Sequence, residues 1–359
     1  AKALWITVSV LVVTCPCSLS LATPIALTVA GGALAKDGLL VTRGHAIETL
    51  ARATHFVFDK TGTLTTGRMH LVDTLPTAVL SGDECLALAA ALEHASEHPL
   101  ANALRQAFSG DLPQVGEVRN EPGQGIEALV GGRRYRIGRP DYALGLSAGN
   151  LPETAAHWLE SGDTVVALGD ETGCLALFRI GDELRAESLT LVNYLRAAGK
   201  KIVLLTGDAE SVARRIAGNL GIEDVRAGVT PQGKHECVTA LQAAGAVVAM
   251  VGDGVNDAPV LAQAQVSVAM GGGAQLARTQ SDFVLLSENL DHLRFGLQRA
   301  QRTLSIIRQN LWWSFAYNFV ALPLAIAGYV TPWLAGIGMS ASSLLVVLNS
   351  LRIQRQETD

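Results

Sequence analysis

The stretch Asp59-Lys60-Thr61-Gly62-Thr63-Leu64-Thr65 follows directly on the apolar run Phe56-Val57-Phe58. Such a run predicts a short buried strand, and the threonines and glycine after it predict a tight polar loop. An aspartate at the end of a strand, on such a loop, is placed to attack a phosphoryl group and form an aspartyl phosphate. We therefore predict a phosphoryl-transfer centre with Asp59 as its nucleophile.

Three further apolar runs, at 202–205, 247–251 and 283–286, also lead into polar loops. Continuous apolar runs are typical of parallel strands that helices cover on both faces. In open α/β sheets the ligand lies beyond the carboxyl ends of the strands. Here those ends carry Thr206-Gly207-Asp208 and Gly252-Asp253-Gly254-Val255-Asn256-Asp257. The sequence therefore predicts an α/β domain with its site at this edge of the sheet.

The side chains on these loops match the needs of phosphoryl transfer. Developing negative charge requires Mg²⁺, which prefers carboxylate, phosphate and water oxygens, and Asp253 and Asp257 supply carboxylates. Lys234 adds a fixed cation and Thr206 a hydrogen-bond donor. Taken singly, an aspartate at a strand end is more often a helix cap, and Gly-Asp-Gly is more often a turn. Only their joint occurrence indicates catalysis.

Residues 68–172 interrupt the α/β pattern with a helical stretch from Gly82 to Phe108 and Gly-rich, strand-like sequence from Gly131 to Gly138. We predict an α+β domain inserted between the first and later strands of the sheet. The imidazole of His98 can hydrogen-bond or stack on adenine, and the glycines of Gly123-Gln124-Gly125 let a backbone approach phosphates closely. Alone, these residues would indicate a surface histidine and an ordinary loop.

The composition indicates a membrane protein, since 49% of the residues are hydrophobic and only 17% are charged. No residue between Lys2 and Lys36 carries a formal charge, and none does from Gln309 to Leu351. About 20 apolar residues span the hydrocarbon core as a helix, so the first stretch predicts one span and the second predicts two, separated near residues 328–332. The net charge of −5, without a basic cluster, argues against nucleic acid as the main partner.

Basic residues flank all three predicted spans on one side. The positive-inside bias identifies that side as cytoplasmic, which places the segment between the spans in the cytoplasm. The flanking residues are Lys36, Arg43, Arg302, Arg308, Arg352 and Arg355.

Cys15-Pro16-Cys17 lies about halfway along the first predicted span. Proline removes a backbone donor and breaks the helical ladder, so both sulfurs can face one point. Paired thiolates select soft cations, Cu(I) above all, although cysteines are tolerated in apolar helices and prolines also kink them. Polar side chains in lipid usually mark a pathway, but serine also joins helices. The other two spans carry Tyr317, Asn318, Met339 and Ser343.

Together, Asp59–Thr65 and the run from Gly252 to Asp257 resemble the P-type ATPases, whose phosphorylation domain belongs to the haloacid-dehalogenase-like superfamily. The resemblance covers essentially the whole chain and implies ATP and Mg²⁺ as cofactors. It implies that Asp59 is the nucleophile, that Thr206 and Lys234 contact the phosphoryl group, that Asp257 holds the loop, and that Asp59, Asp253 and the Thr61 carbonyl bind Mg²⁺. The family's usual asparagine after Thr-Gly-Asp is Ala209 here.

Ser96-Glu97-His98-Pro99 is similar to the nucleotide-binding domain of the heavy-metal P-type ATPases. That resemblance implies an ATP site formed by Glu93, His98, Gly123, Gly125 and Gly138. A Gly-Asn pair is usual in the family where this chain has Gly138-Arg139.

A Cys-Pro-Cys span, a Tyr-Asn span and a Met-x-x-Ser-Ser span together resemble the Cu(I)-transporting subgroup. The resemblance implies outward transport of Cu(I) across a bacterial plasma membrane, with a cytoplasmic copper chaperone as partner, along a path formed by Cys15, Cys17, Tyr317, Asn318, Met339 and Ser343. The chain contains no Thr-Gly-Glu, the loop of the family's actuator domain, so we expect a C-terminal fragment of a longer pump.

Two alternatives belong to other functional classes. A membrane-anchored phosphatase of the same superfamily would usually carry a second aspartate where this chain has Thr61, which is a poor general acid or base. An idle copper-binding assembly subunit would not need Asp59, Lys234, Asp253 and Asp257 together. The predicted domain map is 1–50 first span, 51–67 phosphorylation domain, 68–172 nucleotide-binding domain, 173–298 phosphorylation domain again, and 299–359 the last two spans and a short tail.

Overall fold

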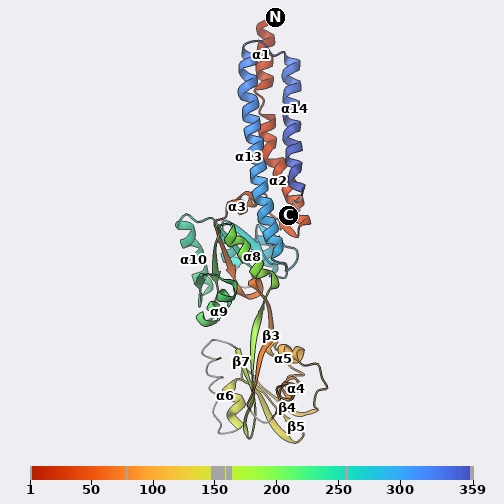
Figure 1. Cartoon of the computed structure of the whole chain (residues 1–359), viewed down its shortest axis with the longest axis vertical. Coiled ribbons are helices and arrows are strands. Elements are labelled where there is room, and N and C mark those ends of the chain that lie inside the picture. The colour runs from red at the N-terminus through yellow and green to blue at the C-terminus, as the bar shows by residue number, and fades with distance from the viewer. Residues whose placement is uncertain (1, 78–79, 147–157, 159–163, 255–257, 356–359) are drawn as a thin grey trace. The chain divides into compact units, whose positions relative to one another are not determined.

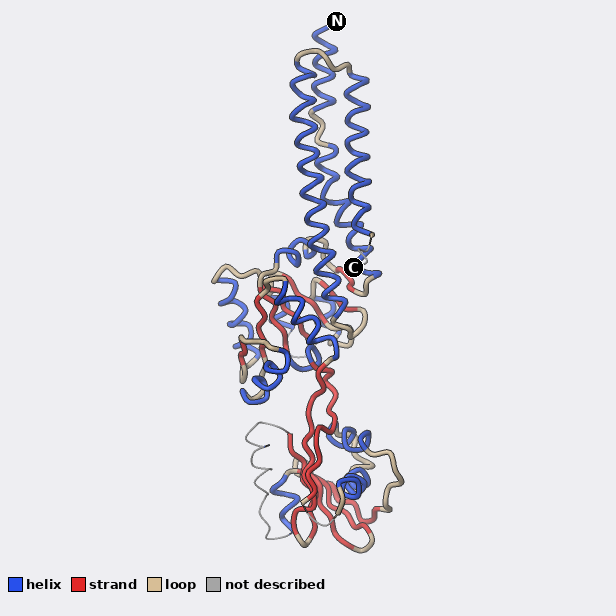
Figure 2. The backbone as a smooth tube through the Cα atoms, in the orientation of Figure 1, coloured by secondary structure: helices blue, strands red, loops and turns tan. Residues whose placement is uncertain are grey.

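The computed structural model describes residues 2–77, 80–146, 158, 164–254 and 258–355. The chain forms two compact units. Unit 1 comprises residues 1–58, 189–202 and 231–359, and unit 2 comprises residues 59–188 and 203–230. Figures 1 and 2 show the helices and strands of both units.

A seven-stranded sheet has the order β1-β13-β12-β11-β2-β9-β10. β11 pairs in parallel with both β2 and β12, β12 pairs in parallel with β13, and β9 in parallel with β10, whereas β1 runs antiparallel to β13. The strands are β1 (Leu39–Val41), β2 (His55–Asp59), β9 (Lys201–Leu205), β10 (Asp224–Arg226), β11 (Val248–Gly252), β12 (Val266–Ala269) and β13 (Phe283–Leu285).

The apolar runs of the sequence become the strands of this sheet because their side chains are buried on both faces. Phe56, Val57 and Phe58 of β2 are fully buried, as is β11 from Val248 to Val251. The parallel α/β fold is therefore confirmed for this part of the chain. Its helices are α3 (Ala46–Arg52), α8 (Ala186–Ala197), α9 (Glu210–Leu220), α10 (Pro231–Ala243), α11 (Ala258–Gln263) and α12 (Gln275–Gln280).

A second, antiparallel sheet has the order β3-β8-β7-β6-β5-β4 and lies in unit 2. Its strands are β3 (Thr65–Pro76), β4 (Val115–Glu121), β5 (Gly125–Val130), β6 (Arg133–Gly138), β7 (Thr164–Asp170) and β8 (Gly173–Leu184). The strands pack against α4 (Gly82–Leu92) and α5 (Pro99–Ala107) through a core that contains Leu92, Leu104, Ile137 and Phe178. A short helix α6 (Pro140–Ala143) and turn η2 (Leu144–Leu146) complete the described part.

Two features of this α+β domain differ from the prediction. β8 belongs to its sheet, beyond the predicted boundary at Thr172, since the apolar run 175–178 is buried between two antiparallel neighbours, β3 and β7. The predicted helical stretch 82–108 is two helices. α4 begins with a capping box formed by Ser81 and Glu84, and α5 restarts with Pro99 at its first turn.

In unit 1 the first helices of the chain lie end to end, and the long C-terminal helices run beside them (Figure 1). They are α1 (Lys2–Val13), α2 (Cys17–Lys36), α13 (Asp291–Ile326) and α14 (Pro332–Leu351), the last followed by the turn η3 (Arg352–Gln354). In the described chain two segments are long and apolar enough to cross a membrane, Ala3–Lys36 and Pro332–Gln354. The span within α13 stays a prediction, because Gln309, Asn310 and Asn318 lower its mean hydropathy.

Candidate functional site: a phosphorylation loop, a nucleotide pocket and a sulfur pair

The strand register brings the carboxyl ends of β2 and β11 to the same edge of the sheet. Phe58 of β2 is paired with Val251 of β11 in parallel, so the chain leaves the sheet at the same edge after both residues. Asp59, the last residue of β2, is 6% exposed. The carbonyl of Asp253 accepts a hydrogen bond from the backbone N–H of Ala274 at 3.0 Å, which fixes the start of the second loop.

Thr206 lies in a loop after β9, and its backbone and side chain form hydrogen bonds that stabilise this loop. Its N–H donates to the carbonyl of Arg226 at 3.0 Å, and its carbonyl accepts from Val229 N–H at 3.0 Å. The hydroxyl accepts from the N–H of Asp208 at 3.2 Å. Thr206 is 2% exposed, so its side chain is fixed in place.

Lys60, next to the nucleophile, forms an ion pair with Asp208. Sequence analysis did not predict this pair, although Asp208 was noted in Thr206-Gly207-Asp208. Beside it opens a cleft of about 640 Å³, lined in part by Lys60, Asp182, Asp208 and Arg215. Both residues of the pair come from unit 2, and their contact ties the loop after β2 to the loop after β9.

The remaining predicted residues of this centre differ in placement. Lys234 is 6% exposed on α10, where a buried ammonium needs polar partners. Thr61 is exposed on the turn after Asp59, and Gly62 behind it has φ +70°, a conformation that favours glycine. Asp257 lies outside the described residues.

The end of β8 and the residues directly after it contact the phosphorylation loop, and these contacts were not predicted. Asp182 Oδ2 lies 2.5 Å from the hydroxyl of Thr65, and Arg185 and Ser188 reach the loop backbone. Burial raises the pKa of Asp182, opposed by the Thr65 hydrogen bond and by Lys60. The available signal in the sequence was the run Gly181-Asp182-Glu183-Leu184-Arg185, in which charged residues come soon after the buried apolar run 175–178.

Glu93 and His98 lie around the break between α4 and α5. Glu93 is 9% exposed, and burial raises the pKa of its carboxyl against the opposing effects of Ser96, His98 and Arg105. His98 Nδ1 accepts a hydrogen bond from the N–H of Leu100 at 3.2 Å. A neutral imidazole in that tautomer carries its proton on Nε2. His98 is exposed and can donate to a ligand through that atom.

Gly125 and Gly138 are directly paired across β5 and β6. A Cβ on Gly138 would lie 2.2 Å from the carbonyl oxygen of Gln124, and one on Gly125 would lie 2.1 Å from that of Ile137. Close backbone approach therefore requires glycine at both positions, independently of any ligand. Gly123, at φ +76° in the preceding turn, has open space beside it. The structure thus gathers these three predicted glycines at one end of the β5–β6 hairpin.

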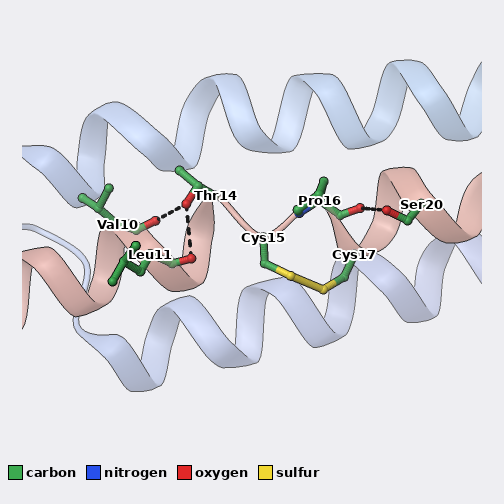
Figure 3. The surroundings of a disulfide bond; sticks show 7 residues. All are labelled: Val10, Leu11, Thr14, Cys15, Pro16, Cys17 and Ser20. Carbon is green, nitrogen blue, oxygen red and sulfur yellow. Dashed lines mark hydrogen bonds between the residues drawn. A yellow bond between two sulfur atoms is a disulfide. The ribbon is translucent and has the colours of Figure 1, made fainter.

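Cys15-Pro16-Cys17 lies at the break between α1 and α2, as predicted for an interrupted span (Figure 3). Side chains on both sides satisfy backbone carbonyls near the break: Thr14 donates to Val10, and Ser20 donates to Pro16, each at 2.9 Å. The two sulfurs converge and are joined as a disulfide. The break turns both side chains to one side of the chain, and their role as Cu(I) ligands stays a prediction.

The other predicted path residues lie on α13 and α14. The Oδ1 atom of Asn318 is buried, and among the described residues it has no hydrogen-bond partner. Tyr317 lines an apolar cavity of about 450 Å³ between α1, α13 and α14, together with Val13 and Gly338. Met339 and Ser343 are half-buried on α14. Within the described ranges no three His, Cys, Asp or Glu side chains form a metal-binding group.

Comparisons with known proteins agree with this architecture. The family model of the haloacid dehalogenase-like hydrolases matches residues 53–265. The chain is 39% identical over 354 residues to a probable copper-exporting P-type ATPase V of Mycobacterium tuberculosis, covering 97% of this chain and 46% of that protein. It is 37% identical over 356 residues to a probable copper-importing P-type ATPase A of Enterococcus hirae, covering 97% and 48%.

Among solved structures, a zinc-transporting PIB-type ATPase in its E2.Pi state is similar with a TM-score of 0.89 at 36% identity, covering 96% of this chain and 57% of that one. The chain spans about half the length of the curated relatives it matches. It therefore belongs to the haloacid dehalogenase-like hydrolases and, among them, to the heavy-metal P-type ATPases.

Proposed function

We propose that the full-length protein uses ATP to move Cu(I) out of the cytoplasm, by phosphorylation and dephosphorylation of Asp59. The observation that carries the proposal is the buried carboxylate of Asp59 at the end of β2, beside the strand that leads into Asp253. A carboxylate buried at a strand end is costly unless charged or polar groups face it, and phosphoryl transfer requires such a concentration of charge.

In the proposed step a carboxylate oxygen of Asp59 attacks the γ-phosphorus of ATP. The new bond is an oxygen–phosphorus bond of an acyl phosphate, the bond to the β–γ bridging oxygen breaks, and ADP leaves with that oxygen. Thr206 and Lys234 contact the transferred group, Thr206 as a hydrogen-bond donor and Lys234 as a fixed cation. The burial of both side chains supports a rigid arrangement that requires little reorganisation.

The donor set of the phosphorylation loop fits Mg²⁺, because two carboxylates and a backbone carbonyl are the hard oxygens that this ion prefers. Asp59, Asp253 and the Thr61 carbonyl would hold it. When bound, Mg²⁺ neutralises charge that develops on the phosphoryl group. ATP would lie with its adenine near Glu93 and His98. The protein backbone at Gly123, Gly125 and Gly138 would approach its phosphates.

Cu(I) is the proposed substrate because the first span presents two sulfurs at one point, and sulfur ligands favour soft cations. Cu(I) binds after an external thiol reductant has converted the disulfide to two thiols, which lose their protons as they become ligands. The buried Asn318 Oδ1, which has no hydrogen-bond partner in the described part of the chain, and the neighbouring Tyr317 support a path continued by Met339 and Ser343. The uncharged segments 3–35 and 309–351 carry no carboxylate, which favours Cu(I) over zinc. A copper chaperone would deliver the ion at a bacterial plasma membrane.

Phosphorylation of Asp59 is tested by acid-quenched labelling of the full-length protein with γ-labelled ATP. We expect a hydroxylamine-labile adduct that Asp59→Asn abolishes and that the exposed control Asp141→Asn leaves intact. Unchanged labelling of the Asp59 variant would refute the assignment. A parent that hydrolyses simple phosphate esters without metal stimulation would instead be a phosphatase. Thr61 argues against that function, because it is a poor general acid or base.

A further inference from the structure

Arg185, directly after β8, lies against the loop that follows Asp59. Its Nε donates to the carbonyl of Thr63 at 3.0 Å, and its Nη2 donates to the carbonyl of Gly62 at 3.1 Å. The residue is 9% exposed. A guanidinium is rarely buried to this degree unless its N–H groups are bound. Here part of its planar fork is used to hold two consecutive peptide groups.

The same segment holds the next carbonyl as well. Leu64 O accepts from the backbone N–H of Arg185 at 2.9 Å and from the hydroxyl of Ser188 at 2.8 Å. Ser188 is fully buried. Three successive carbonyls, from Gly62 to Leu64, therefore accept hydrogen bonds from two residues about 120 positions away in the sequence.

This loop needs external support because its own backbone is irregular. Thr61 has φ −74° and ψ 130°, and Gly62 has φ +70° and ψ −4°, so regular helical bonding does not fix their peptide planes. A peptide group is rigid and planar. Holding the carbonyls of Gly62 and Thr63 therefore restricts the peptide planes that directly follow Thr61.

We propose that Arg185, with Ser188, is a positioning residue for the phosphorylation of Asp59. It holds the backbone from Gly62 to Leu64, and through that backbone it orients the Asp59 carboxylate and the Thr61 carbonyl. The inference rests on the proposed function of Asp59. Lysine cannot replace Arg185, because a single ammonium lacks the planar fork that reaches two carbonyls at once.

Two measurements on the full-length protein test this role. The first is the rate of Asp59 phosphorylation at saturating ATP, with the ATP concentration for half-maximal rate. The second is hydrogen exchange of peptides that cover residues 59–65, which reports loop order without any turnover. The variants are Arg185→Lys and Ser188→Ala, and the matched control is Arg214→Lys, an exposed arginine on α9.

We expect Arg185→Lys to lower the phosphorylation rate by roughly 10- to 100-fold, since small misplacements of reacting groups have effects of this size. The half-saturating ATP concentration should stay within about two-fold of the parent, and exchange should accelerate in 59–65 while other peptides of the sheet keep parental rates. Ser188→Ala should show the same pattern more weakly, and Arg214→Lys should match the parent.

Parental rate and parental exchange in both Arg185→Lys and Ser188→Ala would overturn the inference. A raised half-saturating ATP concentration with unchanged maximal rate would also overturn it, because Arg185 would then bind nucleotide. If Arg185→Lys does not fold, Ser188→Ala decides. If the parent is not phosphorylated at Asp59, the proposed function fails, and the exchange of 59–65 still tests the contact separately.

Discussion

Arg299 of α13 donates its Nε–H to Oδ2 of Asp37, directly after α2, at 2.6 Å. The two side chains are 9% and 10% exposed. The same guanidinium donates through Nη1 to the carbonyl of Ile353, after α14. One buried cation thus joins the ends of α2 and α14 to the side of α13.

Removing one partner of this pair should be strongly destabilising. Asp37→Ala leaves the Arg299 charge buried without its carboxylate, and we expect a loss of about 3–5 kcal/mol in the free energy of unfolding. The matched control is Asp141→Ala, whose pair with Arg139 is exposed on both sides, with an expected loss below about 1 kcal/mol. Denaturant unfolding in detergent measures both, and equal losses would contradict the prediction.

The thiol of Cys85 should resist alkylation at neutral pH. Burial, together with the neighbouring Glu84 and Cys174, raises the pKa of Cys85 to about 11. Because the thiolate is the nucleophile, labelling by iodoacetamide should stay slow below pH 9 and rise towards pH 11. Peptide mass mapping across that range assigns the site, and rapid labelling of Cys85 at pH 7.5 would disagree.

The same shift predicts a loss of stability at high pH. A raised folded-state pKa means that folding favours the neutral thiol, so its contribution is complete below the unfolded value of 9.0 and is lost as the pH rises through about 11. Unfolding curves at pH 8 and pH 11 should therefore differ more in the parent than in Cys85→Ala. An identical pH dependence in both proteins would rule the effect out.

Gly138→Ala should destabilise the antiparallel sheet far more than Gly131→Ala. The new Cβ on residue 138 would meet the Gln124 carbonyl at 2.2 Å, at φ +149°, which we expect to cost about 3 kcal/mol or more. Gly131 has φ +58° with open space, so alanine there should cost only about 1–2 kcal/mol. The fluorescence of Trp158, buried in the same domain, follows unfolding, and equal midpoints would contradict the ranking.

Cu(I) binding should require reduction of the sulfur pair. We expect the oxidised protein to bind no Cu(I) at Cys15 and Cys17, and the reduced protein to release protons as neutral thiols become ligands. Competition with a chromogenic Cu(I) chelator, before and after reductant, measures this. Cys15→Ser and Cys17→Ser should each abolish the gain, whereas the control Cys237→Ser should retain it. Retention of the gain in either Cys15→Ser or Cys17→Ser would disprove the site.

The fold was predictable where a strand is buried on both faces, because such a strand requires consecutive apolar residues. β2, β9, β11 and β13 are continuous apolar runs, and parallel strands covered on both faces require such runs. The predicted boundary at Thr172 left β8 outside the inserted domain, and its sequence does not show the error, because an inner antiparallel strand that is covered on both faces is also a continuous apolar run. Composition cannot tell these two environments apart.

The candidate site was predictable only in part, for two physical reasons. The contact of Arg185 with Gly62 joins residues 123 positions apart. Because every residue has a backbone carbonyl, such a hydrogen bond does not restrict the residue type of its acceptor. The oxidation state of Cys15 and Cys17 depends on the redox environment, which residue order does not encode. Asp59 could be proposed as a site residue from the sequence because its strand and its loop are contiguous.

β1 pairs with β13 in antiparallel fashion, with Leu39 opposite Leu285. These two strands at the edge of the sheet connect to α2 and α13, two helices of unequal stiffness. α13 contains no proline between Asp291 and Tyr317, a rise of about 39 Å at 1.5 Å per residue, so it can carry axial torque over that length. α2 contains Pro24, where a helix bends. A twist of the sheet edge should therefore rotate Tyr317 on α13, whereas bending of α2 should reduce the rotation that reaches Cys17. The orientation of Tyr317 relative to Cys17 would then change.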